Sequence, residues 1–364
     1  MSVENSEPGP MNPARLPTFR QSIEFTGQAR EYFGIWITNV LLSLATVGIY
    51  SAWAKVRRLT YFYNKTRIHD CPFGYHATGL QILKGRVIAV AILVTFNVIS
   101  VFSPLATIIF ALAFAAVTPL LMNMSMKFSA RMTSFRNIRF DWHGTYGKSF
   151  LFFMIGPLLG FVSLGLLTPL MSKYFYRYYA TGHSYGVTRF SADPPTSNFY
   201  FAFLVGALLP GMLLGILTGA GYLIYLSFAV GVPVWMVWDA SHGGILIVLA
   251  FGFLTGFLFS FAFIFNVLCR NLLVSALTLP DAATFSSRIN LFRFIWISLS
   301  NLFLAIVSLG LMIPWCQIRM YRYLCDCTSL SATGDLDEFV DSERKKRSAF
   351  GEEIAEFEGL DVSI

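Results

Sequence analysis

The chain has 364 residues, of which 55% are hydrophobic and 13% are charged, whereas a soluble globular chain carries roughly 25% charged residues. The net charge is +7, but the segment from Asp335 to the C-terminus carries −6 and leaves +13 on the rest, mostly in loops between apolar runs. Such loops orient membrane helices and attract anionic lipid headgroups, so this pattern excludes an ordinary soluble domain and predicts no nucleic-acid partner.

Two apolar runs occupy the first part of the chain. Residues 1–22 are polar and rich in proline, which predicts a disordered lead before a membrane domain at residues 23–334. The first predicted span is residues 32–53, long enough at about 1.5 Å per residue to cross a hydrocarbon core of roughly 30 Å. The run at residues 87–122 is too long for one helix and is broken at Ser103-Pro104, so we expect two spans joined as a hairpin.

Four further apolar runs follow. Residues 150–171 contain Gly156-Pro157 and predict either one kinked span or a shallow re-entrant hairpin. Residues 199–238 are too long for one helix and contain a glycine-rich stretch at 215–221, so we expect two spans there. Runs at 245–268 and 291–314 supply the last two, and the acidic tail at 335–364 is expected to be amphipathic or disordered. The predicted fold class is an all-α integral membrane protein, a polytopic helical bundle of about eight (seven or eight) transmembrane helices.

The loops predict an orientation. Positive residues concentrate on the cytoplasmic side, and loops 54–86 and 125–149 are the most basic, so we place both in the cytoplasm. Loop 172–198 is also net basic, yet a single crossing by the run at 150–171 would send it to the other side. That conflict favours the re-entrant hairpin.

The first and last spans show an internal repeat at an offset of 262 residues. Asn39, Gly48, Trp53, Arg57, Tyr61 and Thr66 recur as Asn301, Gly310, Trp315, Arg319, Tyr323 and Thr328. Weaker copies follow the third and fourth runs. Short alternating stretches begin at Phe73 and Arg139 and predict short juxtamembrane extended segments, which would turn back towards the next span.

Five segments of the chain carry a resemblance to a known family. They are residues 25–33, 39–66, 181–190, 269–279 and 323–339, and the runs GIYSAW at 48–53 and GDLD at 334–337 are the most specific. In these segments the chain resembles the YjgN family of bacterial inner-membrane proteins, a family of unknown function. The resemblance implies a multi-pass protein of the bacterial cell inner membrane and no known reaction.

Two sets of residues are candidates for a functional role in or near the membrane. Asn39 and Asn301 lie at equivalent depths in the repeated spans, where they would line a shared polar path or hydrogen-bond to neighbouring helices. The second set comprises an indole, a guanidinium and a phenol on one helical face, which suits either simple interfacial anchoring or a specific lipid site. Its members are Trp53, Arg57 and Tyr61 with Trp315, Arg319 and Tyr323.

Two histidines form a third candidate set. His76 and His143 occupy matched positions in the two most basic loops and are either a pH-sensing pair or ordinary loop histidines. The five cysteines have no framework or metal-ligand spacing, so we expect no metal and no cofactor. No catalytic motif is present, so we expect no enzyme.

Two functions from different classes remain open. The repeat, the interrupted spans and the paired asparagines favour a transporter or channel-like protein. The alternative is a non-transporting membrane scaffold or lipid-interacting protein whose partners are membrane lipids with anionic headgroups, favoured by the basic aromatic faces. The sequence does not indicate an oligomeric state.

Overall fold

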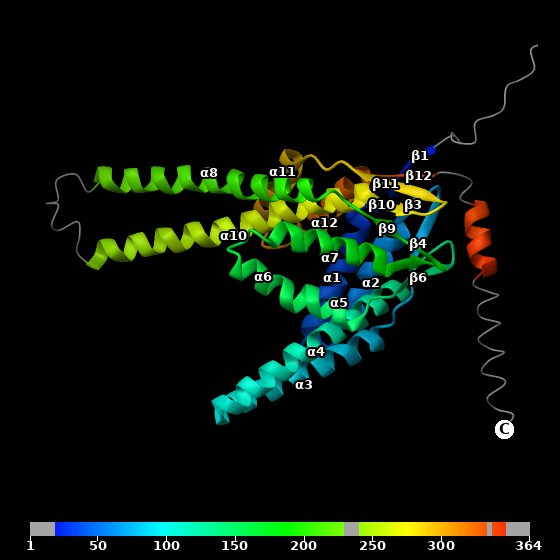
Figure 1. The fold of residues 1–364 in the computed structure, drawn as a ribbon, viewed down its shortest axis with the longest axis horizontal. Coiled ribbons are helices and arrows are strands. Elements are labelled where there is room, and N and C mark those ends of the chain that lie inside the picture. The colour runs from blue at the N-terminus through cyan, green and yellow to red at the C-terminus, as the bar shows by residue number, and fades with distance from the viewer. Residues whose placement is uncertain (1–18, 229–239, 333–336, 347–364) are drawn as a thin grey trace, which may run out of the picture.

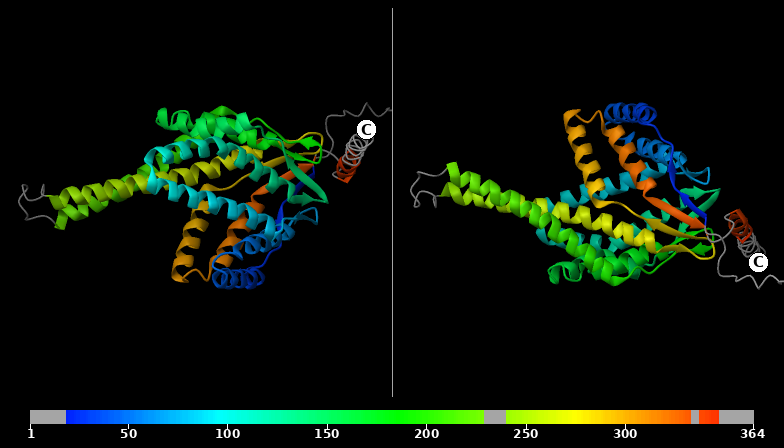
Figure 2. Two further views of the ribbon diagram at one scale, coloured as in Figure 1. Left: turned by 90° about the horizontal axis from the view of Figure 1, so that it is seen from below. Right: turned by 90° about the horizontal axis from the view of Figure 1, so that it is seen from above.

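The computed structural model describes residues 19–228, 240–332 and 337–346, in which pairs of helices alternate with short strands (Figure 1). All the helical pairs project from the strands towards the same side (Figures 1 and 2). The pairs are α1 (Ala29–Ala45) with α2 (Ser51–Lys65), α3 (Gly79–Phe102) with α4 (Pro104–Arg131), α5 (Tyr146–Phe150), η1 (Leu151–Ile155) and α6 (Gly156–Val162) with α7 (Thr168–Gly182), α8 (Thr196–Phe228) with α10 (Ala240–Ala276), and α11 (Leu291–Val307) with α12 (Ile313–Asp326).

The strands form two antiparallel sheets. One has the order β2-β3-β4-β5-β6-β7-β8 and the other the order β1-β12-β11-β10-β9. Their bounds are β1 (Phe19–Ser22), β2 (Glu24–Phe25), β3 (Thr66–Ile68), β4 (Cys71–Tyr75), β5 (Thr133–Phe135), β6 (Ile138–Trp142), β7 (His183–Tyr185), β8 (Thr188–Arg189), β9 (Ser191–Ala192), β10 (Leu277–Leu279), β11 (Ala283–Ser287) and β12 (Thr328–Ala332).

The two sheets meet at both of their edges. Ile23 alone separates β1 from β2, and Phe190 alone separates β8 from β9. Both side chains pack on an apolar core to which both sheets contribute, including Ile138 and Tyr185 from one sheet and Leu330 from the other. The strands therefore make a ring around this core, from which the helical pairs extend.

Local sequence explains the tight β-hairpins of the ring. The two-residue turns His69-Asp70 and Arg136-Asn137 have positive φ at both positions, which is the backbone of a type I′ turn. Asn and Asp tolerate this left-handed conformation better than most residues. The predicted extended segments beginning at Phe73 and Arg139 correspond to β4 and β6, so short strands beside the helices are confirmed.

Among the described residues, four helices are long and apolar enough to cross a membrane: α3, α4, α8 and α10. The run at 87–122 forms α3 and α4 with the break at Ser103, which caps α4 by accepting a hydrogen bond from the backbone N–H of Ala106. The predicted hairpin is confirmed.

Two predicted spans are wrong. Residues 32–53 and 291–314 do not form single helices, because the chain reverses direction after Ala45 and after Val307. Val47 and Gly48 adopt φ of +50° and +86°, and Leu309 and Gly310 adopt +51° and +88°. The N–H of Gly48 then donates to the carbonyl oxygen of Ser43 at 2.7 Å, as in a glycine-terminated helix end.

The run at 150–171 forms a helical hairpin, not one kinked helix. Leu164 and Gly165 have φ of +51° and +91°, and the Gly165 N–H donates to the Gly160 carbonyl oxygen at 2.7 Å, so α6 turns back into α7. The tips of the three short hairpins expose Val47, Leu164 and Leu309 by 92%, 94% and 94%. Each tip thus presents one aliphatic side chain with no protein covering it.

The prediction of two spans within 199–238 is wrong for residues 199–228, which belong to one helix, α8. α8 runs unbroken through residues 215–221, since glycine weakens a helix without ending it and is common in membrane helices. Residues 229–239 lie outside the described residues, and the run at 245–268 lies within α10.

Both ends of the described chain join the ring. The lead predicted at 1–22 includes β1, where Phe19–Ser22 pair with β12 from Ala332 to Ser329, so that part of the prediction is wrong. Residues 337–346 of the acidic tail form a helix whose Phe339 and Val340 pack against the ring core. This tail helix lies at the end of the ring opposite the helical pairs (Figure 1).

Candidate functional site

The short hairpins α1/α2 and α11/α12 share one internal contact that buries a tyrosine. Tyr61 accepts a hydrogen bond from the backbone N–H of Gln28 at 2.9 Å, and Tyr323 accepts one from that of Asn290 at 3.0 Å. Their side chains are only 8% and 6% exposed. Each hydroxyl is therefore bonded to the residue that precedes the first helix of its own hairpin, and neither tyrosine is exposed for contact with lipid.

Trp53 and Arg57 of α2 contact different parts of the protein. The Trp53 ring covers Gly79, where an added Cβ would meet the indole at 2.5 Å, and so joins α2 to α3. Arg57 is exposed and donates to the Tyr50 hydroxyl at 3.0 Å. Only Arg57 of this copy keeps a free approach from outside.

Residues of α11 and α12, with Ala29 of α1, line a basic aromatic recess of about 510 Å³. The Arg319 guanidinium lies 5.2 Å from the Trp315 ring centroid and donates to the Ser300 hydroxyl at 2.8 Å. Arg293 lies 5.3 Å from the Tyr323 ring centroid. We call this recess the outer site; the basic and indole side chains that line it are Arg293, Arg319, Arg322, Trp296 and Trp315, with Asp326 as its acid.

The two asparagines each bond within their own hairpin. The Asn39 amide nitrogen donates to the Ala54 carbonyl oxygen at 3.5 Å, and that of Asn301 donates to the Cys316 carbonyl oxygen at 3.1 Å. No hydrogen bond joins the two side chains in the described parts of the chain. They line neighbouring cavities of about 690 and 660 Å³, which have Arg58 in common. The Oδ1 atom of Asn39 is buried without a partner.

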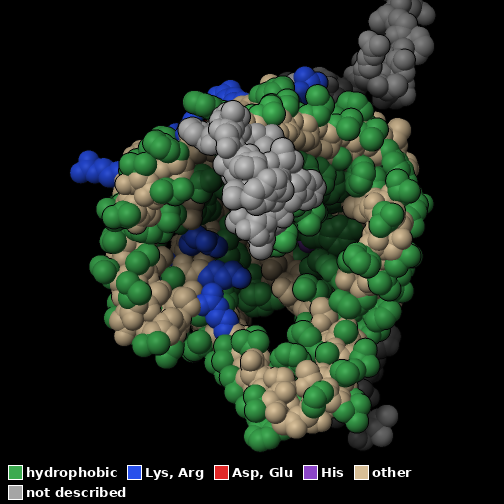
Figure 3. Space-filling model, turned by 90° about the vertical axis from the view of Figure 1, so that its left-hand side faces the viewer, with side chains coloured by type: hydrophobic (Ala, Val, Ile, Leu, Met, Phe, Trp, Pro, Cys, Tyr) green, Lys and Arg blue, Asp and Glu red, His purple; other side chains and the backbone are tan. Residues whose placement is uncertain are grey.

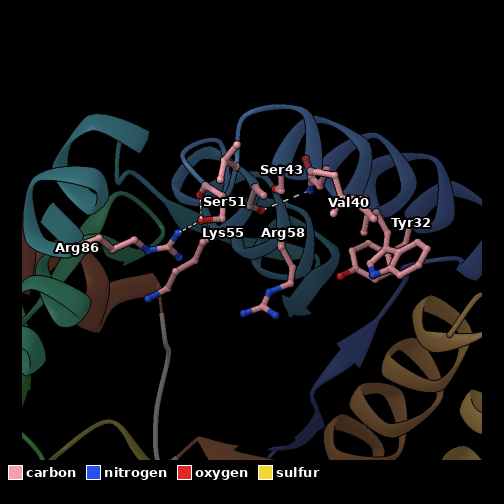
Figure 4. A pocket seen from close by; sticks show the side chains of 13 residues that line it. Tyr32, Val40, Ser43, Ser51, Lys55, Arg58 and Arg86 are labelled. Atoms are coloured by element: carbon pink, nitrogen blue, oxygen red, sulfur yellow. Dashed lines mark hydrogen bonds between the residues drawn. The ribbon is translucent and has the colours of Figure 1, made fainter. Parts of the chain in front are cut away.

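An inner site lies between the helical pairs. Figure 3 looks onto the tips of the helices and shows a hollow surrounded by hydrophobic side chains, with Lys and Arg gathered on its inner wall. Lys55, Arg58 and Arg86 line the 690 Å³ cavity there, and the Arg86 guanidinium bonds to the Ser51 hydroxyl (Figure 4). Sequence reasoning missed these three residues, although Lys55 and Arg58, three residues apart, share one face of an amphipathic helix.

The paired histidines join neighbouring β-hairpins. The Nε2 atom of His76 lies 2.7 Å from the Ser134 hydroxyl, and that of His143 lies 3.0 Å from the Ser184 hydroxyl. Their backbone N–H groups donate to Met132 and Gly182, again across to the next strand pair. A pH-sensing role for either residue stays a prediction.

The described residues contain no group of three His, Cys, Asp or Glu side chains placed to hold a metal ion. The most buried carboxylate is Glu343 of the tail helix. Burial raises its pKa, but hydrogen bonds from the backbone N–H of Val187 and from Thr188 outweigh burial and hold the pKa below its ordinary value. This carboxylate fastens the tail helix to the ring.

The structure consists of paired apolar helices on a ring of short strands, and four of the described helices are long enough to span a bilayer. These features define a helical membrane protein. The chain belongs to the family described as bacterial protein of unknown function (DUF898), whose model matches residues 20–357. The inner membrane protein YjgN of Salmonella typhimurium is 25% identical over 355 residues, covering 87% of this chain and 89% of the relative.

Proteins of the same name from Escherichia coli O157:H7 and K12 are each 29% identical over 126 residues, 34% of this chain and 31% of theirs. No solved structure matches the chain significantly. The resemblance to the YjgN family is therefore confirmed.

Proposed function

We propose that this protein is a non-catalytic, lipid-interacting protein of the bacterial inner membrane that holds anionic phospholipid headgroups at its outer site. The observation that carries the proposal is the meeting of three arginines and two tryptophans in one recess. Arg guanidinium groups match phosphate oxygens in pairs, and Trp is enriched where acyl chains give way to headgroups.

The surroundings of the outer site support a position at the level of the lipid headgroups. Phe292, Leu299, Phe303 and Ile306 leave the exposed face of α11 apolar towards its tip. Arg293 and Arg322 lie towards the ring end of the same hairpin, and Arg319 lies midway along α12, where it donates to Ser300 of α11. A hairpin with this gradient would insert its tip among acyl chains and leave the recess at headgroup level.

The hairpin form also supports a cytoplasmic ring. Since each helical pair returns to the ring, loops 54–86, 125–149 and 172–198 lie at one end of the molecule. All three are net basic, as cytoplasmic loops are, so the orientation no longer conflicts with the charge of the third loop.

The test is lipid selectivity of the purified protein. Arg293→Gln with Arg319→Gln should lower the ratio of phosphatidylglycerol to phosphatidylethanolamine that co-purifies with the protein by several-fold. Arg57→Gln is the matched control, because Arg57 is exposed and lies outside the recess. An unchanged lipid ratio in the double variant, with the protein folded, contradicts the proposal.

A transporter or channel-like role is the second candidate, favoured by the hollow between the helical pairs (Figure 3). An axial path would have to cross the apolar core of the ring, so this role requires lateral entry or a rearranged ring. Single cysteines at positions 39 and 301 in a cysteine-free background test it. Failure of both to react with a membrane-impermeant thiol reagent from either side removes the polar path.

We also propose that the helical pairs with their strands are copies of one unit. The contact of Tyr61 with Gln28 recurs in Tyr323 with Asn290, and the left-handed turn recurs at Gly48, Gly165 and Gly310. Homologues that lack these matched residues at the same spacing would contradict a common origin of the helical pairs.

A further inference from the structure

The inner site carries three cations and no acid. Lys55 and Arg58 come from α2 and Arg86 from α3, and no Asp or Glu lines the cavity (Figure 4). Neither Lys55 nor Arg58 has an ion pair within the described residues. Cations gathered without a counter-charge in an apolar wall favour an anionic ligand, because the ligand would relieve their mutual repulsion.

An apolar groove leads away from these cations. It has a volume of about 1030 Å³ and lies along α3 and α4 with Met154 from η1; its ring end is at Gln81 and Ile82, and Lys55 and Arg86 lie on its wall beyond them. From Arg86 to Phe96, the part of the groove beyond the cations, α3 rises roughly 15 Å, about half of a 30 Å hydrocarbon core. The other apolar walls include Ile88, Ile92, Phe110, Phe114 and Leu121.

We propose that the inner site binds one anionic phospholipid of the ring-side leaflet, with its phosphate at Lys55, Arg58 and Arg86 and its acyl chains in the groove between α3 and α4. A free phosphate would use the cations and leave the groove unfilled. A zwitterionic lipid would bring its own cation beside three others. Only an anionic amphiphile uses both the charge and the apolar wall.

The inner site is independent of the proposed function. None of its basic residues lines the recess of α11 and α12, which has Arg293, Arg319 and Arg322 instead. Loss of lipid selectivity at one site therefore leaves the other intact, and the two proposals fail separately. The inner lipid is expected to survive the Arg293→Gln, Arg319→Gln double variant.

The charge arm uses delipidated full-length protein in a neutral detergent, titrated with dioleoyl phosphatidylglycerol and followed by native mass spectrometry. Arg58→Gln and Lys55→Gln should each lower the affinity about tenfold, the usual effect of removing one charged hydrogen bond. Arg57→Gln, on the same helix but outside the cavity, should leave the affinity unchanged. Equal affinities for Arg57→Gln and the two cavity variants would overturn the site.

The groove arm tests the acyl chains without touching a charge. A Cβ at Gly85 would meet nothing within 4 Å, and Gly85 lines the groove beside Arg86, so Gly85→Phe should place its ring in the groove. It should lower phosphatidylglycerol affinity at least tenfold. Gly215→Phe on α8, where the space is equally open but outside the groove, is the matched control and should have no effect. Retained affinity in Gly85→Phe would overturn the placement of the chains.

Competition separates a lipid from a free anion. Inorganic phosphate at millimolar concentration should not displace bound phosphatidylglycerol, and dioleoyl phosphatidylcholine should bind at least tenfold more weakly. Displacement by inorganic phosphate would overturn the lipid assignment, because it would show that the cations alone hold the ligand. Equal binding of phosphatidylcholine would overturn the role of the charges.

Discussion

The hydroxyl of Tyr61 accepts a hydrogen bond from the backbone N–H of Gln28 at 2.9 Å and lies 3.0 Å from the carbonyl oxygen of the same residue. The pair Tyr323 and Asn290 repeats both distances to within 0.1 Å. Gln28 and Asn290 are the N-cap residues of α1 and α11. A tyrosine on the second helix thereby fixes the start of the first helix.

Tyr61→Phe should destabilise the protein by about 1–3 kcal/mol, because the part-buried N–H of Gln28 loses its partner and its carbonyl oxygen loses the hydroxyl as well. Thermal unfolding in detergent, followed by tryptophan fluorescence, measures the loss. Tyr146→Phe is the control: Tyr146 is exposed and donates one bond to the Ala116 carbonyl oxygen at 2.8 Å, so its removal should cost much less. Equal losses in the two variants would contradict this account.

The turn of a short hairpin requires glycine at its left-handed position. Gly310 has φ of +88°, where an L-residue is strained, so Gly310→Ala should destabilise the hairpin by about 1–2 kcal/mol. Gly34→Ala, in the interior of α1 with nothing within 4 Å of the new Cβ, should be neutral or stabilising by up to about 1 kcal/mol. The thermal unfolding midpoint of Gly310→Ala should therefore fall, whereas that of Gly34→Ala should stay unchanged or rise.

The tail helix should detach in acid. Glu343 is fully buried, and its hydrogen bonds from Val187 and Thr188 lower its pKa from the ordinary value of 4.5. A carboxyl with a lowered pKa stabilises the folded state above its ordinary pKa, and that contribution is lost as the pH falls through the lowered value. A spin label at Lys345 should thus be immobile at pH 7 and gain mobility as the pH falls below 4.5 and through the lowered pKa of Glu343.

Glu343→Gln should free the label at pH 7 and remove most of its pH dependence, since the variant keeps the shape but not the charge. Glu338→Gln is the control, because Glu338 is exposed on the same helix. If Glu343→Gln keeps the label immobile at every pH, the carboxylate does not fasten the tail helix.

Hydropathy predicts where apolar segments lie but not whether they cross. The hairpin at 87–122 is visible in the sequence because Ser103-Pro104 interrupts it. The turn at Val47-Gly48 lies inside an unbroken apolar run, and a β-branched residue with positive φ is rarely expected there. The short strands were predicted from alternation after Phe73 and Arg139. Ring closure by Phe19–Ser22 instead depends on a distant partner strand, in which Ser331 pairs with Arg20 across 311 residues of sequence.

The candidate sites could likewise be predicted from the sequence only where they depend on local spacing. Arg319 and Trp315 were predicted as a pair from helical spacing, and they contact each other across 5.2 Å. Lys55, Arg58 and Arg86 come together only because Trp53 packs on Gly79 and brings α3 beside α2. No local pattern encodes that packing. Tyr61 and Tyr323 were assigned to the lipid interface because an amphipathic helix shows which residues share a face but not which neighbour covers them.

We expect every helical pair to return to the same side of the membrane, where the ring lies. The direct measurement places single cysteines at positions 70, 137, 187 and 281, in the turns of four β-hairpins, in a cysteine-free background. A membrane-impermeant maleimide is then applied to intact spheroplasts and to inside-out vesicles. We expect all four to react only in inside-out vesicles, and reaction of position 187 from the side opposite to position 137 would contradict the account.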